Sequence, residues 1–143
     1  MKNISIIYWS GTGNTEKMAM AVAEGASAEG NFVKVCEVAK ASMDDVLQVD
    51  AIALGCPSMG AEVLEEDEME PFIQVLETQN LKEKPFVLFG SYDWGDGQWM
   101  REWEDRMKNL GAKLVGEGLI IQNTPDEDGL EQCRQLGKKL ANS

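Results

Sequence analysis

Three nearly continuous apolar runs constrain the fold of this chain more than any other feature. Each run is short and ends in small or polar residues: Ile4–Trp9, Ala51–Gly55 and Pro85–Gly90. A strand that is apolar along its whole length must be covered on both faces, as the inner strands of a parallel sheet are. The runs therefore predict a parallel sheet with helices on both sides.

Helical segments separate these runs from each other and from two further strands. Val33–Val38 alternates, as a more exposed strand does, and Lys113–Ile121 is expected to form the fifth strand. The helical segments show apolar periodicity or N-terminal capping residues: Thr15–Glu29, Ser42–Leu47, Met69–Leu76, Gln98–Leu110 and Pro125–Leu140. The alternation predicts an α/β fold, a single-domain doubly wound five-stranded parallel sheet in the order 2-1-3-4-5 with helices on both faces, over residues 1–143.

In such a sheet, ligands bind beyond the carboxyl ends of the strands, where the strand order reverses. The three apolar strands lead into loops at residues 10–15, 56–62 and 91–97. With the order 2-1-3-4-5, these three loops are expected to line one crevice.

The first loop has the composition of an anion site. It consists of Ser10, Gly11, Thr12, Gly13, Asn14 and Thr15. Its glycines permit positive φ, and the first N–H groups of the following helix have no partner within that helix. The loop holds no charged residue and lacks the Lys of a nucleoside-triphosphate loop. It favours a phosphate monoester bound without metal, although a glycine-rich turn with Thr or Asn capping the helix has the same pattern.

The second loop, at residues 57–62, places a methionine beside a glycine in polar surroundings. The flexible thioether of Met59 can lie over an aromatic ring, and Glu62 can accept a hydrogen bond from a ring N–H. The alternative is a Met59 side chain that packs inward over the turn.

The third loop, at residues 91–97, carries Trp94 among Asp and Gly residues. This indole is expected either to fold inward or to serve as a flat stacking platform. Trp99 and Trp103 lie on the following helix and are expected to be in the core or half-buried. Trp9 is expected to pack under the first loop.

Composition excludes several chemistries. There is no histidine, which removes Ser-His and Cys-His catalysis and imidazole metal ligands. The cysteines Cys36, Cys56 and Cys133 are widely spaced, so free thiols are expected instead of disulfides or a metal site. No apolar run approaches the ~18 residues of a membrane-spanning helix, and the N-terminus does not resemble a secretory signal. A cytoplasmic location is expected.

The net charge of −12 disfavours nucleic acid and anionic membranes as partners. The charge is unevenly spread, because no basic residue lies between Lys40 and Lys82. That span holds Asp44, Asp45, Asp50, Glu62, Glu65, Glu66, Asp67, Glu68, Glu70 and Glu77. Such a stretch is either a solvated face or a docking surface for basic proteins.

With its three loops in this order, the chain resembles a short-chain flavodoxin of the clostridial type over essentially its full length. Residues 10–15 resemble the FMN phosphate loop of that family, and the loops at 59–62 and 91–97 resemble those that cover the two flavin faces. The resemblance implies these cofactor-binding residues: Ser10, Gly11, Thr12, Gly13, Asn14, Thr15, Ser58, Met59, Gly60, Ala61, Glu62, Ser91, Tyr92, Asp93, Trp94 and Gly95.

The resemblance also implies a function. The chain is expected to bind FMN non-covalently and to act as a low-potential one-electron carrier between the semiquinone and hydroquinone states. It would deliver electrons to basic-patched redox proteins that dock near residues 62–70, and it is expected to be a monomer. The family further implies that the peptide after Gly60 turns its carbonyl toward flavin N5. An uncompensated phosphate in acidic surroundings would lower the potential of the last reduction step.

The chain departs from the family pattern at three positions of the expected site. Pro57 stands where clostridial relatives have a small hydroxyl residue, Ala61 where they often have Asp, and Asp93 where a Gly is common. Each departure is expected to tune cofactor affinity or potential.

Other proteins of similar architecture fit less well. A response-regulator receiver needs a phosphoacceptor Asp at the end of the third strand, where this chain has Leu54-Gly55-Cys56. A low-mass phosphatase needs a cysteine in the first loop, which has none. An FMN-dependent reductase remains as the enzymatic alternative to an electron-transfer protein.

Overall fold

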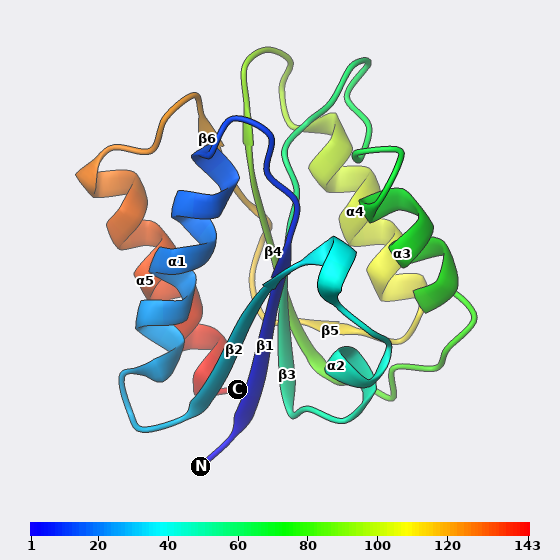
Figure 1. Ribbon diagram of the computed structural model, residues 1–143, viewed down its shortest axis with the longest axis vertical. Coiled ribbons are helices and arrows are strands. Elements are labelled where there is room, and N and C mark those ends of the chain that lie inside the picture. Colours follow the sequence, from blue (N-terminus) through cyan, green and yellow to red (C-terminus); the bar gives the residue numbers. More distant parts are fainter.

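The computed structural model describes all residues, 1–143, and contains one twisted sheet (Figure 1). Its strands are β1 (Asn3–Tyr8), β2 (Phe32–Glu37), β3 (Ala51–Gly55), β4 (Pro85–Tyr92), β5 (Lys113–Leu114) and β6 (Leu119–Gln122). They follow the order β2-β1-β3-β4-β5, with β6 also paired to β4, and all of these pairs are parallel. The predicted strand order is confirmed.

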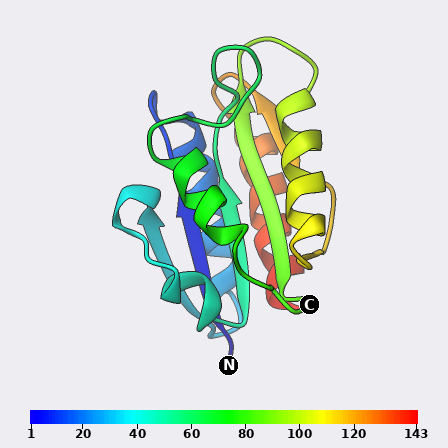
Figure 2. The ribbon, with the colours of Figure 1, turned by 90° about the vertical axis from the view of Figure 1, so that its right-hand side faces the viewer.

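Helices cover both faces of the sheet. They are α1 (Asn14–Ser27), α2 (Asp44–Leu47), α3 (Met69–Leu76), α4 (Gln98–Asn109) and α5 (Glu127–Ala141), and a short 3₁₀ turn spans Val38–Lys40. Helices α1 and α5 lie side by side on one face, and α3 and α4 lie on the other (Figures 1 and 2). None of these helices combines the length and the apolar character that crossing a membrane requires.

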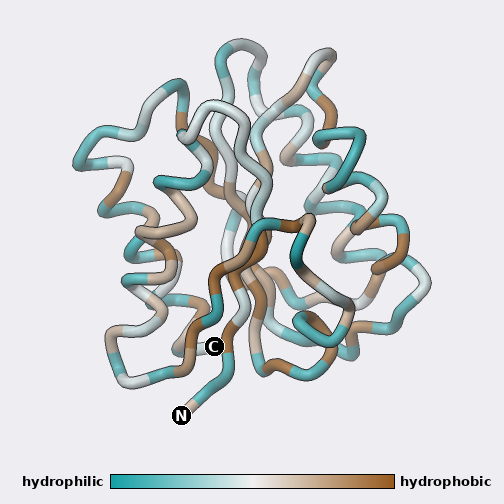
Figure 3. The backbone as a smooth tube through the Cα atoms, viewed as in Figure 1, coloured by the Kyte–Doolittle hydropathy of each residue, from teal (hydrophilic) through white to brown (hydrophobic).

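The alternation of side chains along β1 divides the core into two layers. Ile4 and Ile6 pack toward α1 and α5, whereas Ile7 packs into the layer formed with α3 and α4. Hydrophobic stretches of backbone follow the strands in Figure 3. Trp99 and Trp103 are each 1% exposed, as expected for core residues of α4. The sheet thus lies between two apolar layers, and the loops that follow its strands lie at its carboxyl-terminal edge.

The expectation of one continuous fifth strand over Lys113–Ile121 was wrong. Two short strands, β5 and β6, pair with opposite ends of β4, and residues 115–118 between them belong to neither strand, although the Val115 N–H still donates to the Phe86 carbonyl at 3.0 Å. The N–H of Gly118 donates to Glu104 Oε2 at 2.8 Å instead of to a strand. A Cβ at Gly118 would lie 2.4 Å from the Met100 side chain, so the chain passes too close to α4 for a larger residue.

The backbones of α1 and α5 approach each other closely at two glycines. A Cβ at Gly25 would lie 1.9 Å from the carbonyl oxygen of Arg134, and one at Gly137 would lie 2.0 Å from that of Val22. Neither contact can be relieved by a side-chain rotation, since both oxygens belong to helix backbone. The two helices can therefore pack at this distance only with glycine at both positions.

We expect Gly137→Ala to destabilise the protein by about 1–3 kcal/mol, the typical effect of forcing extra volume into a packed interface. The direction of the stability change is diagnostic, because a glycine-to-alanine substitution inside a helix otherwise stabilises a protein by about 1 kcal/mol. Urea unfolding measures the change. Gly116→Ala is the control, because a Cβ there meets only the mobile end of Lys139. A Gly137→Ala protein as stable as the control would contradict the packing argument.

Candidate functional site

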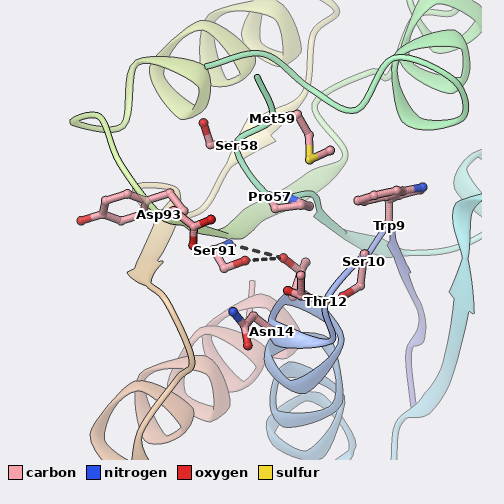
Figure 4. A pocket seen from close by; sticks show the side chains of 12 residues that line it. Trp9, Ser10, Thr12, Asn14, Pro57, Ser58, Met59, Ser91 and Asp93 are labelled. Carbon is pink, nitrogen blue, oxygen red and sulfur yellow. Dashed lines mark hydrogen bonds between the residues drawn. The ribbon is translucent and has the colours of Figure 1, made fainter. Parts of the chain in front are cut away.

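The carboxyl ends of β1, β3 and β4 meet at one edge of the sheet, and the three loops that follow them enclose a pocket (Figure 4). The lining residues come from all three loops: Trp9, Ser10, Gly11, Thr12, Asn14, Thr15, Pro57, Ser58, Met59, Ser91, Tyr92 and Asp93. Residues that lie far apart in the sequence are thus brought together as the strand order predicted. The pocket contains no basic residue.

The first loop is held in shape by the hydroxyl of Ser10. Its Oγ accepts hydrogen bonds from the N–H of Gly13 at 3.1 Å and from the N–H of Glu16 at 3.3 Å. Gly13 has a φ of 99°, which suits glycine, and it is the residue that precedes α1.

Several backbone N–H groups of this loop have no acceptor in the protein: those of Gly11, Thr12, Asn14 and Thr15. They lie at the N-terminus of a helix, where the aligned peptide dipoles favour negative charge. Unpaired N–H groups in a polar pocket without lysine or arginine suit a phosphate monoester.

Ser91, near the end of β4, ties the three loops together. Its hydroxyl lies 2.9 Å from the Thr15 hydroxyl, and its carbonyl accepts from the N–H of Ser58 at 2.9 Å. Thr15 and Ser91 are only 1% and 6% exposed, so each buried hydroxyl needs the other as a partner. The relative positions of the loops are therefore set by hydrogen bonds within the protein.

The second loop forms a closed turn. The N–H and carbonyl groups of Met59 and Val63 are paired in both directions at 2.9 Å, with Gly60 and Ala61 exposed at the tip. Gly60 has a φ of 48°, and no atom lies within 4 Å of a Cβ placed there. The side chain of Met59 lines the pocket and lies on the same side of it as Trp9 (Figure 4).

The third loop holds Trp94 away from the core. Its side chain is 61% exposed, so the indole does not fold inward, and it is free to cover a ligand. Glycines with a φ of 93° stand at positions 95 and 97 on either side of Asp96. Tyr92 packs at the base of the loop against Trp99, with ring centroids 5.8 Å apart.

The carboxylate of Glu62 reaches the third loop from the second. Its Oε1 accepts from the N–H groups of Asp96, Gly97 and Gln98 at 3.2, 3.3 and 3.3 Å. Together with the turn residues Gly13, Gly60, Ala61, Trp94 and Gly95, Glu62 lies outside the lining of the pocket.

Two lining residues, Trp9 and Pro57, were absent from the predicted set. The Trp9 ring packs against the first loop as expected, since a Cβ at Gly11 would lie 3.0 Å from it, and its Nε1 donates to Glu68 Oε1 at 3.1 Å. A tryptophan at the end of an inner strand, next to the glycine-rich first loop, was the available signal. Pro57 was noted only as a departure from the family.

The thiols are not part of the pocket. All three cysteines are free, and Cys56 and Cys133 are buried. Burial raises the pKa of the Cys56 thiol to about 12, which keeps it neutral beneath the second loop. Its sulfur accepts a hydrogen bond from the Glu65 N–H at 3.4 Å, so Cys56 has a structural role.

The site thus combines two features that suit different parts of one ligand. The first loop offers unpaired N–H groups and hydroxyls for a phosphate, and the other loops offer the Met59 thioether and the Trp94 indole for a flat ring. A phosphorylated aromatic cofactor such as FMN fits this combination.

Comparisons with known proteins agree with this geometry. The chain matches the flavodoxin family over residues 6–137. It is 49% identical to a flavodoxin of Clostridium beijerinckii over 97% of this chain and 99% of that one. It is 42% identical to a flavodoxin of Megasphaera elsdenii, over 96% and 98% of the two chains. The solution structure of the two-electron reduced Megasphaera elsdenii flavodoxin superposes with a TM-score of 0.87, covering 98% of this chain and 99% of that one.

A match of this extent decides the family, and the pocket agrees with the cofactor. The chain belongs to the flavodoxin family, the FMN-binding proteins that carry electrons between other proteins.

Proposed function

We propose that this protein is a low-potential one-electron carrier that holds FMN non-covalently in the pocket at the carboxyl edge of the sheet. The observation that carries the proposal is the set of unpaired N–H groups of residues 11, 12, 14 and 15, which line the same pocket as the Met59 side chain, with the exposed Trp94 on the neighbouring loop. FMN, when bound, supplies transfer of electrons one at a time. The protein binds it, orients it and sets how readily it accepts each electron.

Each of the three loops has a distinct role in this proposal. Ser10, Thr12, Asn14 and Thr15, together with the unpaired N–H groups of residues 11, 12, 14 and 15, hold the phosphate. Residues 58–62 cover one face of the ring, with Glu62 available to a ring N–H. Residues 91–95 cover the other face and line the ring edge. Pro57 offers no hydroxyl, so phosphate binding depends on the first loop.

The electrostatic surroundings favour a low potential. The pocket has no basic residue, and the protein carries a net charge of −12. Two unit charges 4 Å apart interact by about 1 kcal/mol in water and about 4 kcal/mol near a protein surface. Adding negative charge to a covered ring beside an uncompensated phosphate is therefore unfavourable, and the last electron is held weakly.

The phosphate assignment predicts a large difference between FMN and riboflavin. We expect the protein to bind FMN at least ~100-fold more tightly, since each hydrogen bond to a charged group contributes about 1.5–3 kcal/mol. Flavin fluorescence quenching measures both dissociation constants. Equal affinities would show that the first loop does not hold the phosphate, and a protein that binds neither flavin would overturn the proposed function.

The tip of the second loop is suited to a change of peptide orientation. Gly60 is exposed, has open space around its Cβ position and a positive φ, and the Met59–Val63 pair fixes the base of the turn. The Gly60 carbonyl can therefore turn toward a proton that the ring gains on reduction while the rest of the loop stays in place.

We expect Gly60→Val to lower the midpoint potential of the first electron by about 60–120 mV. A β-branched residue at positive φ costs about 1–3 kcal/mol, which destabilises the turn whose carbonyl faces the ring proton. A tenfold change in a one-electron equilibrium corresponds to about 59 mV. Gly60→Ala, which is not β-branched, is expected to have a smaller effect. A spectroscopic redox titration measures both. An unchanged first potential in Gly60→Val would contradict the role of the turn.

The acidic residues after the second loop divide into two groups. Several are bonded within the protein. Glu65 accepts from the N–H groups of Asp67, Glu68 and Met69 at 2.7–2.9 Å and so caps α3. Glu70 and Glu77 bind Arg106 of α4, and the hydrogen bond from Arg106 lowers the pKa of Glu70 below its usual value.

Glu66 and Asp67 form the other group, because their exposed carboxylates bind no protein group. They line a groove with Trp9 and Met59, directly beside the pocket. We propose that basic redox proteins dock on this side of the molecule, where free carboxylates lie next to the cofactor.

Electron transfer to a basic haem protein is expected to slow by about tenfold or more between low salt and ~0.5 M salt, because such encounters are steered by charge. The double variant Glu66→Gln with Asp67→Asn should lose much of this dependence. A matched control is Glu29→Gln with Glu83→Gln, which removes two exposed charges at the opposite edge of the sheet. Stopped-flow kinetics measure the rates, and equal salt dependence in both double variants would contradict docking at residues 66–67.

The free thiols and the open site bear on the cellular compartment and the oligomeric state of the protein. Three free thiols are typical of a reducing compartment, which supports a cytoplasmic protein. We propose that the protein works as a monomer, since a small carrier with an open site can then present the same face to donor and acceptor in turn.

A further inference from the structure

The Trp94 turn, residues 93–97, is attached to distant parts of the chain by few polar contacts. Gln122 donates to the carbonyl of Asp93 at 3.2 Å, and Arg101 of the adjacent helix bonds to Asp96. The carbonyl of Gly97 accepts from the N–H groups of Met100 and Arg101 in the first turn of α4, and the remaining bonds to distant residues come from the Glu62 carboxylate. Glu62 therefore links the two loops that are proposed to cover opposite faces of the ring.

The three hydrogen bonds of Glu62 share one carboxylate oxygen, and all three donors lie at the start of one helix. Oε1 accepts from the three consecutive N–H groups of residues 96–98, where α4 begins. Gly97, the residue at the start of that helix, has no side chain with which to cap it. Glu62 supplies the missing cap from another loop, and the positive end of the helix dipole favours its carboxylate.

Both ends of this connection are fixed by the backbone. The Met59–Val63 pair closes the turn that carries Glu62, whose own φ is 56°. On the other side, the carboxylate can approach only because residue 95 is glycine, since a Cβ there would lie 2.3 Å from Glu62 Oε1. The Glu62 carboxylate therefore fits between the second and third loops because the turn orients it and Gly95 leaves room for it.

We propose that Glu62 is a positioning residue that latches the Trp94 turn to the second loop through the N-terminus of α4, and that it does so before the cofactor binds. The purpose of the latch rests on the proposed function, because the latch fixes the loop that carries Trp94 relative to the loop that carries Met59. The hydrogen bonds themselves involve protein groups alone. Glu62 thus acts on the third loop as well as being available to the ring.

Amide hydrogen exchange by NMR on the FMN-free full-length protein tests the latch. In Glu62→Ala, the amides of residues 96–98 should exchange at least tenfold faster than in the unmodified protein. The amides of residues 67–69, which Glu65 caps, should be unchanged. Glu62→Gln keeps a neutral acceptor and should retain part of the protection. Glu66→Ala is the matched control, since it removes an exposed unbonded carboxylate.

A second pair of variants breaks the latch without removing Glu62. Gly95→Ala places a methyl group on the carboxylate position, whereas Gly30→Ala introduces alanine at a similar positive φ, 81° against 93°, with only Met1 nearby at 3.8 Å. The amides of residues 96–98 should lose protection in Gly95→Ala alone. The dissociation constant for FMN should rise at least tenfold in Gly95→Ala relative to Gly30→Ala.

The possible outcomes separate the latch from the proposed function. Unchanged protection of residues 96–98 in Glu62→Ala, or an equal loss of protection across the whole molecule, overturns the latch. Loss confined to residues 96–98 in both Glu62→Ala and Gly95→Ala supports it. If the unmodified protein fails to bind FMN, the proposed function falls, and the exchange rates of the FMN-free protein still decide whether the latch exists.

Discussion

The hydrogen bonds of Ser91 hold the site together. Its hydroxyl and that of Thr15 are buried at the edge of the sheet and satisfy each other, while its carbonyl anchors Ser58. A buried hydroxyl without a partner costs about 1–3 kcal/mol, so the pairing of Thr15 with Ser91 favours this arrangement of the loops. These hydrogen bonds bring together three loops that lie far apart in the sequence, so that the loops form one pocket. The first loop can then leave several of its N–H groups unpaired, because the hydroxyl of Ser10 and the Thr15–Ser91 pair maintain its shape.

Acidic side chains have more than one use in this molecule. A run of carboxylates after the second loop suggests a charged surface, and Glu66 and Asp67 are free for that role. Glu62 and Glu65, however, each accept backbone N–H groups at the start of a helix, α4 and α3 respectively. The helix dipoles stabilise these charges. The segment that follows β3 is thereby fastened to two helices, and it carries the Met59 side chain of the site with it.

Much of the fold and part of the site were predictable because they depend on local patterns. Apolar runs required inner parallel strands, and α3 spans Met69–Leu76 as its periodicity predicted. The interruption of the fifth strand was not predictable in the same way, because the Gly118 N–H donates to Glu104 of α4 and the backbone there passes close to Met100 of the same helix. Trp9 was similarly missed as a lining residue, since its place in the pocket depends on packing against Gly11 and on a hydrogen bond to Glu68. The contacts with Glu68 and Met100 join residues that lie far apart in the sequence, so no local pattern specifies them.

The sequence by itself determined the strand order, the uncharged, glycine-rich composition of residues 10–15 and the loops in which a site would form. These follow from periodicity, glycine spacing and the absence of charge, which are properties of neighbouring residues. Only the tertiary structure decided which side chains meet: the Thr15–Ser91 pair, the exposed Trp94 and the Glu62 carboxylate at the start of α4. The physical reason is that the partner of a buried polar group depends on which strand ends lie side by side, and on distances of a few ångströms that no local pattern specifies.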